Sequence, residues 1–295
     1  MDSPLDTQAL QQQLLAADYV ADRPLAATLG LFCQLGRPLL LEGDAGVGKT
    51  EVARVLARVR ETELIRLQCY EGLDISSAVY EWNYQHQLLA IKLLEAGDYD
   101  PGNAEQQIFS RRYLLQRPLL QAITQLRPPV LLIDEIDRAD EEFEAFLLEL
   151  LADFQVTVPE LGTIEATSRP LVVLTSNGTR ELSDALRRRC LYHYVEFPAF
   201  DKELQIVATR LPELGANLSR QVVEFVQALR QAQLRKTPGI AETLDWARAL
   251  LGLGLDSLDR DLDAVMDSLV CLLKTREDAL QLERAEVERL VARAV

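Results

Sequence analysis

The sequence is poor in the side chains that build metal centres and disulfide frameworks. It contains 4 cysteines and 2 histidines among 295 residues. No two cysteines have the spacing of a zinc site, so we expect reduced thiols rather than metal ligands or disulfides. The histidines, at positions 86 and 193, stand far apart in the chain. Multi-histidine metal chemistry is therefore not expected.

Positive charge and long apolar runs are also scarce. Lys and Arg total 31 against 46 Asp and Glu, a net charge of −15. This sign repels a phosphate backbone, so no nucleic-acid partner is expected. No stretch approaches the ~18–20 apolar residues that span a bilayer, and the N-terminus lacks the basic start and apolar core of a signal peptide. We expect a cytoplasmic location, with peripheral attachment to the inner face of the membrane as the open alternative.

What the sequence does contain is an alternation of short apolar runs with helical patterns. Continuous runs such as these predict strands buried on both faces of a parallel sheet. They are PLLLEG (38–43), ELIRLQC (63–69), PVLLIDE (129–135) and PLVVLTSN (170–177). The stripe of Val52, Val55, Leu56 and Val59 predicts an amphipathic helix after the first strand. The alternation predicts an α/β fold with a parallel β-sheet flanked by helices.

Two segments interrupt this alternation. Residues 154–168 carry two short β-type runs around PELG, which predicts a hairpin. Residues 70–98 predict a polar, aromatic loop followed by a helix that ends near Gly97. After residue 199 only helical patterns follow. We therefore predict an α/β domain over residues 1–199 and an all-α domain over residues 200–295.

The stretch LLLEGDAGVGKTEVARVLARV carries the clearest chemical motif. Gly43, Gly48, Lys49 and Thr50 match G-x-x-x-x-G-K-[S/T]. Glycines let consecutive backbone N–H groups surround phosphate oxygens, Lys49 would reach the β- and γ-phosphates, and the Thr50 hydroxyl would bind Mg²⁺. A chance glycine-rich turn is the alternative, which the preceding strand and following helix disfavour. The candidate nucleotide-binding residues are Gly43, Asp44, Ala45, Gly46, Val47, Gly48, Lys49, Thr50 and Glu51.

Acidic residues end the third predicted strand, in VLLIDEIDRAD. We assign Asp134 to the Mg²⁺ ion, through water, and Glu135 as the base that takes a proton from the attacking water. The alternative is an acidic pair that caps the next helix. Asp137 and Asp140 are interpreted as caps and surface charge rather than catalysts.

Two further groups complete the predicted catalytic set. Asn177 ends the fourth strand, where its amide would position the lytic water if the strand neighbours Glu135. Taken alone, Asn177 is better explained as a turn residue before Gly178, and its predicted role depends on the other motifs. Arg188 and Arg189 lie in ELSDALRRRCLY, read as the next helix, and predict an arginine finger supplied to a neighbouring subunit, with Arg189 favoured. The alternative is a solvated helix cap.

This ordered set resembles the AAA+ ATPases across nearly the whole chain. The hairpin at 154–168 resembles the pre-sensor-1 hairpin of one AAA+ clade, and the 70–98 segment looks like its helix-2 insertion. Together they resemble the MoxR branch. Within it, IRLQCYEGLD…YEWNYQHQLL and TSNGTRELSDALRRRCLY look like the CoxD-type subgroup.

The resemblance implies an ATP- and Mg²⁺-dependent chaperone that forms a homo-oligomeric, hexameric ring. It further implies a partner with a von Willebrand factor A domain and a metalloenzyme client, such as a molybdenum–copper carbon monoxide dehydrogenase. Adenine contacts would fall on Tyr19 and Val20, and residues 200–295 would form a helical lid. One departure is that Gly239 or Ala241 occupies the place of the sensor-2 arginine. The possible substitutes are Arg235, Lys236 and Arg248.

Two questions stay open at this level. Tyr80, Trp82 and Tyr84 would either face a central pore or pack against the lid or the adjacent helix. The function alternatives are an AAA+ motor acting on nucleic acid, which shares every nucleotide residue, and a nucleotide-gated scaffold with little turnover. The negative charge disfavours the first and Glu135 disfavours the second.

Overall fold

The computed structural model describes residues 6–95 and 108–295. In this part of the chain the central feature is a five-stranded parallel sheet with the order β2-β5-β8-β1-β9. The strands are β1 (Leu39–Glu42), β2 (Leu64–Gln68), β5 (Val130–Asp134), β8 (Leu171–Ser176) and β9 (Leu191–Tyr194). The order places β1 beside β8 and β8 beside β5. The carboxyl ends of these three strands therefore lie side by side.

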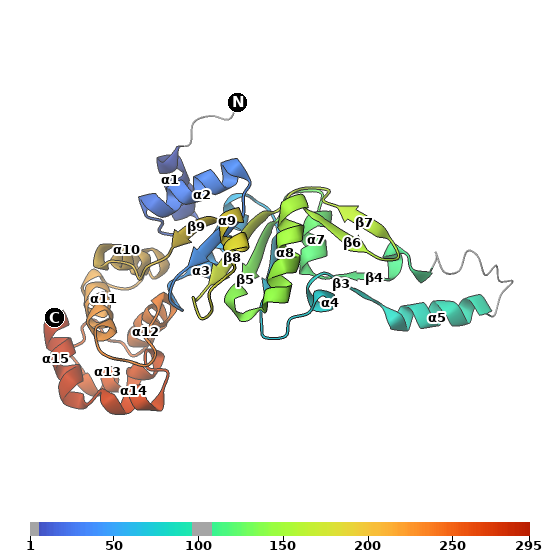
Figure 1. The fold of residues 1–295 in the computed structure, drawn as a ribbon. Helices are drawn as coiled ribbons and strands as arrows, with labels where there is room; N and C mark the ends of the chain where they lie inside the picture. Colours follow the sequence, from blue (N-terminus) through green and yellow to red (C-terminus); the bar gives the residue numbers. More distant parts are fainter. Residues whose placement is uncertain (1–5, 96–107) are drawn as a thin grey trace.

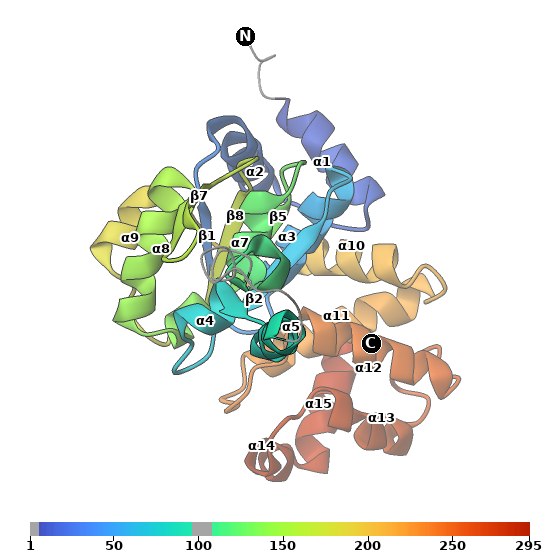
Figure 2. The ribbon, with the colours of Figure 1, turned by 90° about the vertical axis from the view of Figure 1, so that its right-hand side faces the viewer.

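Helices cover both faces of this sheet, as Figures 1 and 2 show. One face packs on α1 (Thr7–Ala16), α2 (Arg23–Leu35) and α3 (Lys49–Val59). The other packs on α7 (Pro118–Thr124), α8 (Glu141–Asp153) and α9 (Asp184–Arg189). Successive residues of one strand alternate between the two cores: Leu39 and Leu41 belong to one, and Leu40 to the other. This two-sided burial confirms the predicted α/β fold and explains the continuous apolar runs.

The fifth strand differs from the prediction. The predicted helix through ELSDALRRRCLY ends at Arg189, and Leu191 begins β9. Leu191 pairs with Leu39 in a parallel register, and exposure alternates along β9 because it is an edge strand. Its short, half-polar sequence carries little of the signal that marks a strand buried on both faces.

Two small antiparallel pairs stand beside the main sheet. β6 (Gln155–Val158) and β7 (Gly162–Glu165) form the hairpin predicted at 154–168. The segment 70–98 contains α4 (Ile75–Ala78), β3 (Tyr80–Trp82) and α5 (Tyr84–Glu95), and residues 96–98 lie outside the described residues. The predicted polar loop is thus partly wrong, because β3 pairs with β4 (Leu114–Gln116) after the short 3₁₀ turn Arg111–Tyr113.

The three aromatic residues of this segment have different surroundings. Trp82 is buried and meets Phe109 edge-on with ring centroids 5.3 Å apart. Tyr80 is partly buried and contacts Trp82 in the same manner at 6.4 Å. Tyr84 opens α5 and is 63% exposed. Within this chain the packing interpretation therefore fits Trp82 and Tyr80, and only Tyr84 faces outward.

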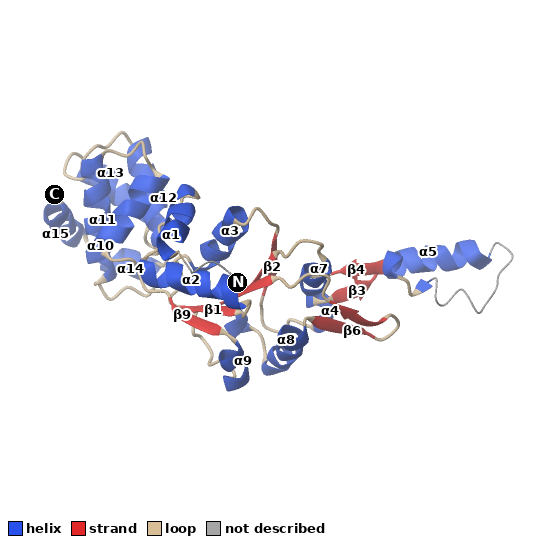
Figure 3. Cartoon of the chain, turned by 90° about the horizontal axis from the view of Figure 1, so that it is seen from above, coloured by secondary structure: helices blue, strands red, loops and turns tan. Residues whose placement is uncertain are grey.

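After residue 199 the described chain is helical and has a core of its own. The helices are α10 (Phe200–Arg210), α11 (Ala216–Arg230), α12 (Ile240–Gly252), α13 (Leu262–Ser268), α14 (Arg276–Gln281) and α15 (Arg284–Ala294). We call them the C-terminal helices. In the core of these helices, the rings of Phe225 and Trp246 contact each other with their centroids 4.7 Å apart. These helices and α5 lie at opposite ends of the molecule (Figures 1 and 3).

A buried ion pair ties the first three C-terminal helices together. Arg230 on α11 donates to both oxygens of Glu203 on α10, at 2.6 and 2.7 Å. Thr243 on α12 donates to the same carboxylate at 2.9 Å. Arg230 also donates to the carbonyl of Pro238, so the pair fixes the chain that leads into α12.

Candidate nucleotide site

The segment that follows β1, residues 43–50, consists of a loop and the first two residues of α3, and its glycines shape the loop; we call this segment the phosphate loop. Gly46 and Gly48 have φ of 84° and 96°, a region that residues with a side chain rarely adopt. A Cβ on Gly43 would stand 2.2 Å from the carbonyl oxygen of Val195, which follows β9. A Cβ on Gly46 would stand 2.8 Å from the Cα of Gly239. The loop thus exists only because these positions carry no side chain.

Lys49 begins α3 and turns back over this loop. Its buried ammonium donates to the carbonyl oxygens of Gly43 and Asp44, both at 2.7 Å, and to Oδ1 of Asn177 at 2.9 Å. Burial lowers the pKa of Lys49 from its ordinary value, although the nearby carboxylate of Asp137 opposes the shift. All three hydrogen-bond acceptors are neutral. An anionic phosphate oxygen would therefore compete with them favourably.

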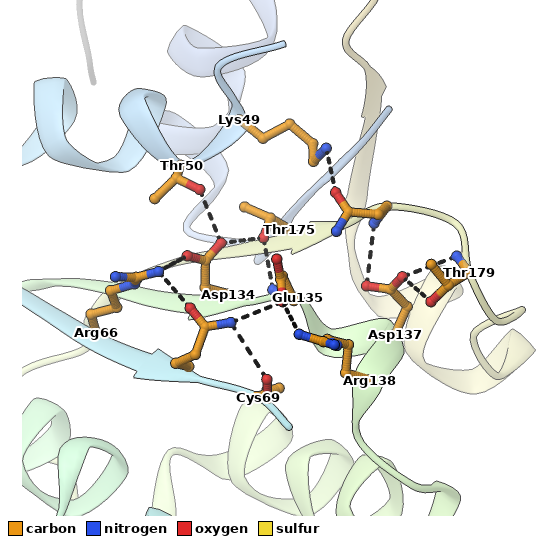
Figure 4. Close-up of polar contacts among 12 residues, drawn as sticks. Lys49, Thr50, Arg66, Cys69, Asp134, Glu135, Asp137, Arg138, Thr175 and Thr179 are labelled. Carbon is orange, nitrogen blue, oxygen red and sulfur yellow. Dashed lines mark hydrogen bonds and ion pairs between the residues drawn. The ribbon is translucent and has the colours of Figure 1, made fainter. Parts of the chain in front are cut away.

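Asp134 lies beside the phosphate loop at the end of β5. Its Oδ1 accepts hydrogen bonds from Thr50 Oγ1 at 3.1 Å and from Thr175 Oγ1 at 2.6 Å (Figure 4). Its Oδ2 accepts from Nε and Nη2 of Arg66 at 3.0 and 2.5 Å. The carboxylate is 3% exposed. The two residues predicted to hold Mg²⁺, Thr50 and Asp134, are therefore in direct contact.

Glu135 follows in a strained backbone conformation. It has φ 56° and ψ 51°, a left-handed geometry that is costly for a residue with a long side chain. Its N–H donates to Thr175 Oγ1 at 2.9 Å. Its carboxylate accepts from Gln68 and from Arg138, each at 3.1 Å. The side chains of Gln68 on β2 and of Arg138 thus hold this carboxylate, and Glu135 lines the same cavity as Lys49.

Asn177 follows β8 and points its amide oxygen at Lys49. Asp137 holds the turn that carries it, since its carboxylate accepts from the N–H groups of Asn177 and Thr179 and from the Thr179 hydroxyl. Burial raises the pKa of Asp137, but these hydrogen bonds outweigh it and hold that pKa below its ordinary value. The interpretation of Asp137 as surface charge is wrong, because it is 3% exposed. Asp140 is the N-cap of α8, as expected.

Arg188 and Arg189 do not reach this cavity in their own chain. Both side chains are exposed at the end of α9. Within the described residues, neither guanidinium forms a hydrogen bond or an ion pair. Their carbonyl oxygens accept from Arg37, at 2.7 Å for Arg188 and 3.3 Å for Arg189. The base of this segment is therefore fixed while its two charges face outward.

Tyr19 and Val20, the predicted adenine contacts, line the same cavity of about 440 Å³. Burial raises the pKa of Tyr19 above its ordinary value. The cavity continues from the phosphate loop to the C-terminal helices. Its far side combines apolar residues with the charged Glu196, Lys202 and Arg210; the apolar residues are Val195, Pro198, Ile206, Ile240 and Leu244.

Of the two residues expected at the sensor-2 place, Ala241 lines the cavity, and Gly239 contacts the phosphate loop. The three possible substitutes, Arg235, Lys236 and Arg248, do not line the cavity within this chain. Arg248 pairs with Asp245, and Arg235 pairs with Glu277. The cationic residues that line the cavity besides Lys49 are Arg54, Arg66, Lys202 and Arg210, none of which the sequence singled out.

The donor set fits a nucleoside triphosphate with a divalent cation. The glycine positions leave a backbone cradle that Cβ atoms would fill, and Lys49 is held only by neutral acceptors. Thr50 and Asp134 offer a hydroxyl and a carboxylate together, which are hard oxygen ligands. In residues 6–95 and 108–295 no three His, Cys, Asp or Glu side chains gather as a metal cage. Such a site would leave most Mg²⁺ ligands to phosphate and water.

No helix within the same two ranges has both the length and the apolar character needed to cross a bilayer. The thiols of Cys69 and Cys190 are unpaired and buried, and burial raises the pKa of each to about 12. They are accordingly structural rather than reactive.

Comparison with known proteins gives matches over most of the chain. The gas vesicle ATPase GvpN of Haloferax mediterranei is 24% identical, over 98% of this chain and 83% of its own length. An uncharacterized protein of Staphylococcus aureus (strain USA300) is 28% identical, over 85% of this chain and 88% of its own. Among solved structures, the RuvB Holliday junction branch migration motor of Thermotoga maritima is 17% identical with a TM-score of 0.44, covering 96% of this chain and 72% of that one.

The sequence model of the AAA domain, dynein-related subfamily, matches residues 38–190. This range is more than half of the chain and contains the phosphate loop, Asp134, Glu135 and Asn177. The chain therefore belongs to the AAA domain family, dynein-related subfamily, and is a P-loop ATPase.

Proposed function

We propose that this ATPase is a magnesium-dependent motor of the MoxR type that remodels or matures a protein client. The observation that carries the proposal is the convergence of three strand ends on one cavity. Lys49 and Thr50 come from the loop after β1, Asp134 and Glu135 from β5, and Asn177 from β8. Lys49 contacts Asn177 and Thr50 contacts Asp134, while the backbone N–H of Glu135 donates to Thr175 on β8.

The chain's own residues would act as follows. Lys49 leaves its neutral acceptors for the β- and γ-phosphates, and the backbone of the phosphate loop binds their oxygens. Thr50 and Asp134 would hold Mg²⁺, which supplies neutralisation of the phosphate charge when bound. Glu135 accepts the proton of the attacking water, and Asn177 orients that water.

Replacing Glu135 by Gln tests this assignment. The amide keeps the size of the side chain and cannot act as a base. We expect ATP to bind with near-parent affinity and turnover to fall by about 10²–10⁴. Glu149→Gln, an exposed position on α8, is the matched control and should retain turnover. Equal rates for parent and Glu135→Gln would remove Glu135 from the mechanism.

We further propose that Arg189, with Arg188 as the second choice, completes the site of a neighbouring copy. The exposed side chains and the fixed backbone beneath them support this assignment. It requires a homo-oligomer, and a hexameric ring is the form we propose. Mixing Arg189→Ala subunits with Glu135→Gln subunits should restore part of the activity, because one interface in each mixed pair is intact. Failure at every ratio would indicate a site completed within one chain, or another arginine.

The domain division and the biological role are proposals of the same kind. Residues 1–199 would form the nucleotide-binding domain and residues 200–295 a helical lid, with the separate core after residue 199 in support. The CoxD-type subgroup, a von Willebrand factor A partner and a molybdenum-enzyme client follow from the two sequence stretches that resemble that subgroup. Co-purification of a Glu135→Gln chain with such a partner, dependent on ATP, is the expected result. Binding that is equal with and without nucleotide would count against a motor role.

Two alternatives make different predictions. A nucleic-acid motor would bind DNA at low salt in a filter assay and turn over faster with it, which the net charge of −15 disfavours. A nucleotide-gated scaffold would bind ATP with little hydrolysis. Ala241 at the sensor-2 position is the observation in its favour, and measurable turnover that Glu135→Gln abolishes would exclude it.

A further inference from the structure

Arg66 is a cavity residue whose position the proposed mechanism does not use. It lies on β2, the strand next to β5, and its side chain is 44% exposed. Nε and Nη2 both donate to Oδ2 of Asp134, at 3.0 and 2.5 Å (Figure 4). Nη2 also donates to Oε1 of Gln68 at 2.5 Å. The guanidinium is thus fixed at the outer oxygen of the acid expected to face the metal.

This contact neutralises the negative charge of the buried Asp134 carboxylate. Both oxygens of Asp134 already accept two hydrogen bonds each, and the two donors to Oδ1 are neutral hydroxyls. A buried carboxylate is strongly destabilising unless a cation is paired with it. Within the described residues, Arg66 is the cation in contact with Asp134. It therefore supplies the charge that a divalent ion would otherwise bring.

The other cations of the cavity are engaged elsewhere. Arg54 and Arg210 pair with the two oxygens of Glu51, at 3.4 and 3.6 Å. Lys202 pairs with Asp22 at 2.6 Å. Removing Arg66 would leave Asp134 without a substitute partner, whereas removing Arg54 would leave it untouched.

We propose that Arg66 competes with the divalent cation for Asp134. The protein without nucleotide then binds Mg²⁺ poorly. The metal binds together with the phosphates, because their negative charge adds to that of Asp134 and favours the metal over Arg66. This inference rests on the proposed role of Asp134 in holding the metal. A neighbouring charge within about 4–6 Å changes the affinity of a site for a proton by roughly one to three powers of ten. A comparable effect is expected for a divalent ion.

The test is a titration of the full chain with Mn²⁺ in the absence of nucleotide, followed by electron paramagnetic resonance of the free ion. Arg66→Met removes the charge and keeps an apolar stem of similar length. We expect it to bind Mn²⁺ at least about tenfold more tightly than the parent. Arg54→Met is the matched control, since it deletes a cavity arginine that pairs with Glu51, and it should bind as the parent does. Equal affinities for parent and Arg66→Met would overturn the proposal.

Arg66→Met leaves Asp134 unpaired and is expected to lower the stability of the fold, so a second measurement uses the melting temperature. A ligand that binds only the folded state raises the melting temperature. Mn²⁺ should therefore raise the melting temperature of Arg66→Met more than that of the parent. Arg66→Lys keeps the charge and should stay close to the parent in both assays. A gain of Mn²⁺ affinity in Arg66→Lys as large as in Arg66→Met would contradict charge competition.

A separate arm distinguishes this inference from the role of Asp134 itself. In the parent, Mg²⁺ should strengthen ATP binding, and Asp134→Asn should reduce that gain. If Asp134→Asn keeps the full gain, the proposed role of Asp134 fails. If the gain is lost but Arg66→Met binds Mn²⁺ no better than the parent, only the competition by Arg66 fails.

Discussion

The contact between Gly46 of the phosphate loop and Gly239, the residue before α12, predicts the effect of one added methyl group. Gly239 precedes α12 with φ −86° and ψ −175°, a conformation open to any residue. In Gly239→Ala, however, the new Cβ would stand 2.6 Å from the Cα and 2.7 Å from the carbonyl oxygen of Gly46. Carbon atoms pack best at about 3.5–4.0 Å. The two backbones must therefore move apart by about 1 Å.

That movement has a calculable cost. Overpacking of this kind costs about 1–3 kcal/mol. Separation also breaks the hydrogen bond from Ile240 N–H to the Gly46 carbonyl, 3.0 Å long, which contributes about 0.5–1.5 kcal/mol. Ile240 and Leu244 form part of the cavity wall, so the wall moves with α12. We expect ATP affinity to fall by roughly ten- to hundredfold, at about 1.4 kcal/mol per factor of ten.

The assay is a titration with a fluorescent ATP analogue, with a thermal unfolding curve for each variant. Gly252→Ala is the matched control, since Gly252 ends the same helix and its Cβ would meet nothing within 4 Å. It should bind nucleotide as the parent does. If Gly239→Ala binds as tightly as Gly252→Ala, the contact between loop and helix does not shape the cavity and the reasoning is refuted.

Three other predictions concern stability. Arg230→Met should destabilise the fold by about 3–5 kcal/mol in urea, because it leaves the fully buried Glu203 carboxylate unpaired; a loss below about 1 kcal/mol would contradict this. The pKa of Asp137 is depressed in the fold, so its charge contributes stability above the unfolded pKa of about 3.9, and the contribution is lost as pH falls through the folded pKa. Asp137→Asn should flatten that acid dependence, and parallel curves for parent and variant would refute the assignment. Trp82→Ala should cost about 3–5 kcal/mol in thermal unfolding while Tyr84→Ala should cost little, because only Trp82 is buried; equal losses would contradict the packing described here.

The sequence predicts those parts of the fold whose signal is local. The four strands ending near Glu42, Gln68, Asp134 and Ser176 are confirmed. Burial on both faces leaves a continuous apolar run in the three inner strands, whereas the edge strand β2 buries Ile65 and Leu67 and exposes Arg66. The amphipathic stripe of α3 is likewise confirmed. The edge strand β9 carries a weaker signal, because it has only four residues, none of them is buried, and it begins directly after the short helix α9.

The parts of the site that sequence reasoning missed depend on contacts between distant segments. Arg66 looks like a surface residue of a strand, and only the β2–β5 pairing brings it to Asp134. Asp137 looks like a cap, and its partners at Asn177 and Thr179 follow the neighbouring strand β8. Neither of these contacts can be predicted from hydrophobic periodicity or from motif spacing. The position of Gly239 against Gly46 is equally invisible until the chain has folded back on itself.

Gly43 and Gly46 have one mechanical consequence when considered together. The carbonyl of Val195 abuts the first, and Gly239 abuts the second. Two backbone segments therefore contact the phosphate loop: one precedes α10, and the other follows α11. A change in the shape of the phosphate loop on phosphate binding is therefore expected to displace both contacting segments. Through these segments the displacement would reach the C-terminal helices.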